Sequence, residues 1–182
     1  MTAINPFDGT THEEFPPEHY QAIGKFITMY SMIESFFHDI FALYSGLDSD
    51  TSRAIMGGMR MKDVIERIKR LIKLRELDPR ILLDIEQIDT LIDPLSQFRD
   101  KIVHRVWLQS DRGPVLLNLS GAKSMATITQ ESVSTEDLNQ KTRETLEVAL
   151  RVMPHAITDT QWEAMPDLFR SMMQAPWRDK LL

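Results

Sequence analysis

The fold of this chain is decided by residues 79–104, which read PRILLDIEQIDTLIDPLSQFRDKIVH. Apolar side chains recur there in steps of three and four, the spacing that places them along one side of an α-helix. Asp78 and Pro79 supply a cap and a first helical residue, so we expect the helix to begin there and to end at His104. The predicted stripe comprises Ile81, Ile85, Ile88, Ile92, Leu95, Arg99 and Ile102.

Two residues interrupt this pattern. Arg99 stands where the stripe calls for an apolar residue, and a charge taken out of water is costly unless it is paired or lines a cleft. Pro94 lies inside the run and removes one backbone hydrogen bond, so we expect a bend about one turn before Arg99.

Similar periodicity predicts the other helices. We expect a first helix over residues 18–44 that Gly46 closes, a short piece over 52–56 before Gly57 and Gly58, and a second main helix over 61–77. A later helix begins at Ser134 and Thr135 and runs to residue 153, where Pro154 ends it.

Between these helices the character of the sequence changes. Residues 105–109, 115–119 and 125–129 are short, β-branched or alternating runs separated by turn residues, as expected of a small hairpin or meander. The chain is therefore predicted to be mainly α, a bundle of four to five main helices with a small antiparallel β-hairpin or meander inserted before the last main helix.

The length of 182 residues and a hydrophobic content of 42% suit one domain with its own core. We expect an N-terminal arm over residues 1–17 and a single domain over 18–182, with the hairpin at about 105–130 and a helical tail at about 158–175. Pro166 should split this tail into two pieces. Its methionine and aromatic residues suit either core packing or a surface for a partner helix.

The net charge of −6 argues against non-specific coating of nucleic acid, but it leaves room for a local basic surface. Cations cluster between residues 60 and 75, and a solvated helix face would show the same pattern. The candidate RNA-binding residues are Arg60, Lys62, Lys69, Arg70 and Lys73.

The chain contains no cysteine, which excludes disulfides, thiolate zinc sites and cysteine nucleophiles and suits a reducing cytoplasm. No apolar run is long enough for a membrane span, so we expect a soluble cytoplasmic protein without a membrane partner. His12-Glu13-Glu14 with His19 lacks a metal-ligand spacing, and we predict no metal site. His38 and His155 stand alone on helices and suit packing or surface positions.

The residue types at the end of the third main helix suit metal-free cleavage of RNA. Arg99 is always charged and fork-shaped, so it can hold a phosphate as negative charge builds up in the transition state. His104 can move a proton near neutral pH, and the carbonyl-rich end of a helix favours the protonated imidazole. Asp100 is the neighbour that would orient one of them. A five-residue offset turns about 140° around a straight helix, so a second chain in a twofold dimer could supply the missing partner.

Glu34 is a second charged residue on an apolar stripe, here in the first helix. It could meet Arg99 in two ways that the sequence leaves open: as a structural ion pair that locks the bundle, or as a support that positions a working site.

The whole pattern resembles the HEPN domain, a helical domain of many bacterial defence and toxin ribonucleases. The resemblance covers about Tyr20 to Met153 and is sharpest over Phe98 to His104, where Arg99, Asp100 and His104 match the arginine, the polar neighbour and the histidine of the family motif. The acidic residue in Met32-Ile33-Glu34 is a looser match. The hairpin and Pro94 depart from the common family pattern.

The resemblance implies a metal-independent endoribonuclease without a cofactor, in which the ribose 2′-hydroxyl attacks its own phosphate and leaves a 2′,3′-cyclic phosphate. It further implies a homodimer with a composite site, a role as a toxin or phage-defence effector, and an antitoxin or other regulatory protein as partner. Two alternatives remain open from the residues: a non-catalytic module that binds RNA, a nucleotide or a protein, and a structural bundle whose oligomer the methionine-rich tail holds together.

Overall fold

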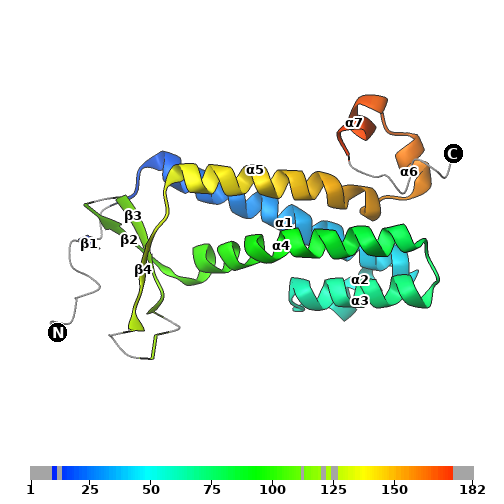
Figure 1. Ribbon diagram of the computed structural model, residues 1–182, viewed down its shortest axis with the longest axis horizontal. Helices are drawn as coiled ribbons and strands as arrows, with labels where there is room; N and C mark the ends of the chain where they lie inside the picture. Colours follow the sequence, from blue (N-terminus) through cyan, green and yellow to red (C-terminus); the bar gives the residue numbers. More distant parts are fainter. Residues whose placement is uncertain (1–9, 12–13, 112, 120–121, 124–126, 174–182) are drawn as a thin grey trace. The chain divides into compact units, whose positions relative to one another are not determined.

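The structure is a computed structural model that describes residues 10–11, 14–111, 113–119, 122–123 and 127–173. It is mainly helical with a small antiparallel sheet, as the sequence predicted (Figure 1). The chain divides into two compact units. The first, which we call the sheet unit, comprises Met1–Thr28 and Pro94–Arg143, and the second, the helical unit, comprises Met29–Asp93 and Glu144–Leu182. The single domain over residues 18–182 stays a prediction.

Long helices account for most of the described residues. The helical elements are α1 (Pro17–Ser45), α2 (Ser49–Met56), α3 (Met61–Leu74), α4 (Pro79–His104), α5 (Thr135–Val152), the 3-10 helix η3 (Met153–Ala156), α6 (Asp159–Glu163) and α7 (Asp167–Met172). The predicted helix end at Gly46 is confirmed, and Pro166 separates α6 from α7 as expected. Helix α5 ends at Val152, one residue before the predicted end, and Pro154 lies inside the 3-10 helix that follows. Among the described residues, no helix combines the length and apolar character that crossing a membrane requires.

Helix α3 ends at Leu74, so the prediction that it continues to residue 77 is wrong. Glu76 has a φ of +50°, the left-handed conformation that terminates a helix. Its N–H donates to the carbonyl of Lys73, and the N–H of Leu77 donates to the carbonyl of Ile72. These two bonds form a Schellman motif, with a glutamate where glycine is usual.

Within the described residues, the sheet contains four antiparallel strands in the order β1-β2-β3-β4. Their bounds are β1 (Thr10–Thr11), β2 (Val106–Ser110), β3 (Gly113–Leu117) and β4 (Gln130–Ser132). The hairpin β2–β3 is confirmed, whereas the third strand lies at residues 130–132 and not at 125–129, of which 125 and 126 lie outside the described residues. Thr10–Thr11 pairs with β2, so the predicted arm over residues 1–17 contributes a strand.

The apolar stripe of α4 is confirmed, since Ile85, Ile88, Ile92 and Leu95 are all buried. On α1, Phe26 is fully buried and Ile27 is half-buried. In the sheet unit, a small apolar cluster is formed by Leu108, Val115 and Leu117, with Leu119 and Ile128 packed against it.

Candidate functional site

The last turns of α4 carry the predicted catalytic residues within the sheet unit. The helix continues through Pro94 to His104, and the N–H of Arg105 donates to the carbonyl of Lys101 at 3.1 Å, the bonding pattern of a regular α-helix. The indole N–H of Trp107 donates to the carbonyl of Ile102 at 3.0 Å and so satisfies one of the terminal carbonyl groups. The end of the helix is therefore well defined, without unwinding before His104.

Arg99 and Asp100 lie together, with the Arg99 guanidinium donating to the Asp100 carboxylate at 3.1 Å. The Arg99 side chain is 31% exposed and His104 is exposed, so solvent reaches both groups. Because α4 stays regular, the five-residue offset separates the two side chains by about 140° around the helix. One chain thus brings Arg99 to Asp100, but it does not set Arg99 and His104 on one helix face.

Glu131 of β4 adds a carboxylate to this end of α4. One of its oxygens lies 2.8 Å from Nζ of Lys101, and the other lies 2.7 Å from the Arg105 guanidinium. The hydrogen bond from Lys101, with Arg105 beside it, lowers the pKa of the Glu131 carboxyl below its ordinary value. Glu131 was not among the predicted site residues, because nothing in the local pattern pairs a strand residue with a helix end 26 residues earlier.

An aromatic cluster packs beside the Trp107 that caps α4. The ring of His19 lies 5.0 Å from that of Trp107, and Phe15 contacts the rings of His19, Tyr20 and Trp107 at 5.6, 5.6 and 5.9 Å. His19 is fully buried, and burial lowers its pKa while nearby Glu18 opposes this. The imidazole of His19 packs with the aromatic rings. His12 and Glu13, which belong to the same stretch of sequence, lie outside the described residues.

In the part of the chain that the structure describes, no three histidine, aspartate or glutamate side chains gather in a way that could hold a metal ion. His19 is therefore not part of such a group within that part. Its Nδ1 lies 3.2 Å from the hydroxyl oxygen of Thr135 at the start of α5. This contact joins the beginnings of α1 and α5 within the sheet unit.

The other predicted residues belong to the helical unit. Glu34 is half-buried on α1, and its support of Arg99, a residue of the sheet unit, stays a prediction. Lys69 is only 14% exposed and pairs with Glu66 at 2.9 Å and Asp89 at 2.6 Å, so its charge is already neutralised. The remaining predicted RNA-binding cations are exposed: Arg60, Lys62, Arg70 and Lys73.

The helical unit also contains a buried polar network that the sequence did not reveal. His155 is fully buried, with Nε2 2.8 Å from the Asp84 carboxylate and Nδ1 3.2 Å from the Tyr44 hydroxyl. The guanidinium of Arg151 donates to the other oxygen of Asp84 at 2.9 and 2.5 Å. The prediction of a packing or surface role for His155 is half right: it is buried, but as part of a charged network.

A signal for Asp84 was present in the sequence. It lies three residues after Ile81 and four before Ile88, which places it on the apolar face of α4. No such signal connects it to His155, which is 71 residues away. Both ring nitrogens of His155 face protein groups, so the network suits stabilisation of the fold better than chemistry on a substrate.

Comparison of the chain with models of known protein families found no match. A search among curated proteins found no similar protein, and a search among solved structures found no similar fold. The functional assignment therefore depends on the residues and geometry described above.

Proposed function

We propose that this chain is a metal-independent endoribonuclease of the HEPN type that acts as a homodimer. The observation that carries the proposal is the placement of Arg99, Asp100 and His104 on the solvent-accessible final turns of one regular helix. This arrangement supplies a phosphate-binding guanidinium, a carboxylate that contacts it, and a group that transfers protons near neutral pH.

In the proposed reaction, the ribose 2′-oxygen attacks the adjacent phosphorus as the bond from phosphorus to the 5′-oxygen breaks. The 2′-hydroxyl loses its proton, and the departing 5′-oxygen gains one. His104 exchanges protons with one of these two oxygens, and Arg99 stabilises the charge that develops on the phosphate. Asp100 orients Arg99 through the contact at 3.1 Å. The products carry a 2′,3′-cyclic phosphate and a 5′-hydroxyl.

The regularity of α4 supports the proposal of a homodimer. Since Arg99 and His104 diverge by about 140° on a straight helix, a single chain does not direct both at one phosphate. Twofold pairing of two α4 helices would combine Arg99 of one protomer with His104 of its partner. A protein of this kind would act as a toxin or phage-defence effector under the control of an antitoxin or another regulatory protein.

The test is incubation of the pure protein with structured and unstructured RNA in the presence of a chelator, followed by analysis of the new ends. We expect cyclic phosphate ends from the natural protein, and a loss of about 10²- to 10⁴-fold for His104→Ala. Arg99→Ala should also lose cleavage. Arg143→Ala is the matched control, because Arg143 also pairs with a neighbouring carboxylate, Glu136, in the sheet unit. Equal cleavage by the His104→Ala variant would remove the catalytic assignment.

A non-catalytic module with the same fold is the second candidate. It is favoured by the regular helix that separates Arg99 from His104 within one chain. Such a module would bind RNA, a nucleotide or a protein without turnover. Tight RNA binding with no new ends, under conditions in which the protein is dimeric, would support this alternative.

A further inference from the structure

We propose that Lys101 and Arg105 form a phosphate-binding subsite for single-stranded RNA, which the carboxylate of Glu131 occupies in the free protein. This inference rests on the proposed function, since it names a contact for the same substrate beside the same histidine. It adds a cation pair that is separate from the exposed cations of α3.

The position of the two cations supports a role beside the reacting phosphate. Lys101 lies in the last turn of α4, and Arg105 follows the helix directly, so the two residues flank His104 in the chain. Their spacing of four residues places them on the same side of the helix end. A strand of RNA whose scissile phosphate reaches His104 would bring a neighbouring phosphate close to this pair.

The contacts of Glu131 show that this pair binds an anion with two oxygens. Each carboxylate oxygen has its own cation, at 2.8 Å from Lys101 and 2.7 Å from Arg105. A phosphodiester also presents two charged oxygens, and arginine and lysine both bind phosphate through short charge-assisted hydrogen bonds. The carboxylate therefore holds the position that a phosphate of the RNA would take.

Replacement of the carboxylate by a phosphate would cost little. The side chains of Lys101, Arg105 and Glu131 are 35, 23 and 38% exposed, so water reaches all three. Ion pairs with this degree of exposure contribute little stability, because solvent screens them in both states. After release, the Glu131 side chain can be hydrated while the phosphate contacts the two cations. The Glu131 carboxylate thus competes with an RNA phosphate for Lys101 and Arg105.

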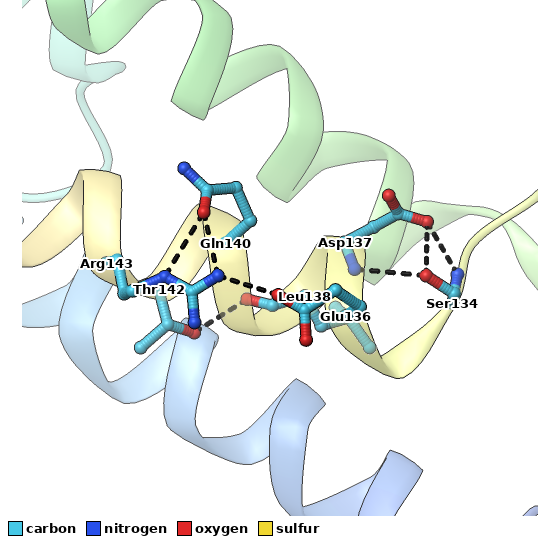
Figure 2. A network of polar contacts seen from close by, with 7 residues as sticks. All are labelled: Ser134, Glu136, Asp137, Leu138, Gln140, Thr142 and Arg143. Carbon is cyan, nitrogen blue, oxygen red and sulfur yellow. Dashed lines mark hydrogen bonds and ion pairs between the residues drawn. The ribbon is translucent and has the colours of Figure 1, made fainter.

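A second ion pair of the sheet unit provides a matched comparison. Arg143 of α5 contacts Glu136 and Gln140 of the same helix, so its partners come from one continuous element (Figure 2). Glu131, by contrast, comes from β4 and contacts residues at the end of α4. Glu131→Gln and Glu136→Gln each remove one negative charge and the ion pairs that it makes. A general effect of net charge on RNA binding is therefore the same for both variants.

The experiment measures binding of a 2′-O-methylated single-stranded oligonucleotide by fluorescence anisotropy over a range of salt concentrations. This probe cannot be cleaved through its 2′-oxygen, so the result does not depend on catalysis. We expect Glu131→Gln to bind about threefold to tenfold more tightly than the natural protein, and Glu136→Gln to stay within about twofold. The combined variant Lys101→Gln with Arg105→Gln should bind less tightly, with a salt dependence shallower by about 0.7 to 1.4 in logarithmic slope.

Equal affinities of the Glu131→Gln and Glu136→Gln variants would overturn the proposal, as would an undiminished affinity of the combined variant. Circular dichroism checks that each variant folds. If Glu131→Gln does not fold, the single variant Lys101→Gln tests the subsite instead, because it keeps the ion pair between Glu131 and Arg105. Unchanged RNA affinity of this variant would refute the subsite, and weaker RNA binding would support it. Binding without cleavage of ordinary RNA would refute the nuclease but leave the subsite intact. Cleavage of ordinary RNA, combined with equal binding affinities of the two glutamate variants, would support the nuclease but refute the subsite.

Discussion

The buried carboxylate of Asp84 should make the stability of this protein sensitive to substitution and to acid. Its side chain is 6% exposed and contacts both His155 and Arg151. Removing one partner from a buried charged network costs about 3–5 kcal/mol, because a buried charge or polar group loses its contact. Asp84→Ala leaves Arg151 with Gln87 as a partner, but it leaves Nε2 of the fully buried His155 facing a cavity. For a chain of this length, the loss corresponds to a decrease of about 6–20 °C in Tm.

Asp84→Asn removes the charge of the side chain but keeps its shape, so it separates these two contributions to stability. Its amide oxygen can still accept from Arg151, so we expect a smaller loss of about 1.5–3 kcal/mol. Glu66→Ala is the matched control in the same unit, since it removes an equal charge from an exposed glutamate that pairs with Lys69, and it should cost about 0.3–0.5 kcal/mol. The measurement is urea unfolding at pH 7, followed by circular dichroism.

The same carboxylate predicts a dependence on pH. Burial would raise the pKa of Asp84, but hydrogen bonds with His155 and Arg151 outweigh burial and lower this pKa below its ordinary value. A carboxyl whose pKa is lower in the folded state contributes stability that is complete above the unfolded pKa, near pH 4, and is lost as the pH falls through the folded pKa. The deficit of Asp84→Ala should therefore shrink below about pH 4. A deficit that is constant from neutral to strongly acidic pH, or one no larger than that of Glu66→Ala, would refute this reasoning.

Three further substitutions test local features of the fold by their effect on the urea midpoint. Glu76→Gly should stabilise the protein by about 0.5–1 kcal/mol, because glycine adopts the left-handed conformation at +50° without strain; a loss of stability would contradict this. Ser134→Ala should cost about 1 kcal/mol, because Ser134 and Asp137 cap α5 through reciprocal hydrogen bonds (Figure 2), and no change would show that the cap is dispensable. Trp107→Phe should cost about 1 kcal/mol through loss of the bond to the Ile102 carbonyl, and an unaltered midpoint would argue that water replaces it fully.

Local patterns predicted most of the helical architecture. The stripe from Ile85 to Leu95 identified α4, because helix periodicity is a short-range property that a single stretch of sequence displays. The strand at Thr10–Thr11 was missed because a two-residue strand has no periodicity, and its partner lies about 100 residues later in β2. The early end of α3 was missed because Glu76 gives no sign of a left-handed conformation, for which glycine is the usual signal.

In the candidate site, too, local features could be predicted from the sequence and long-range contacts could not. The sequence placed Arg99 and His104 at the end of a helix, and the structure confirms this position. The contacts of Glu131 with Lys101 and Arg105 could not be predicted, because they depend on how a strand pairs after a turn and a long loop. The periodicity of one helix does not encode whether a second chain takes part in the proposed site.

The bond between Trp107 and the Ile102 carbonyl gives this protein a built-in optical reporter. The indole lies at the end of the helix that carries His104, and its emission depends on the polarity and hydrogen bonding around it. The chain contains three tryptophans, so a variant that retains only Trp107 would report on this position alone. The fluorescence of such a variant, measured during a titration, would report without a label the binding of a molecule beside His104.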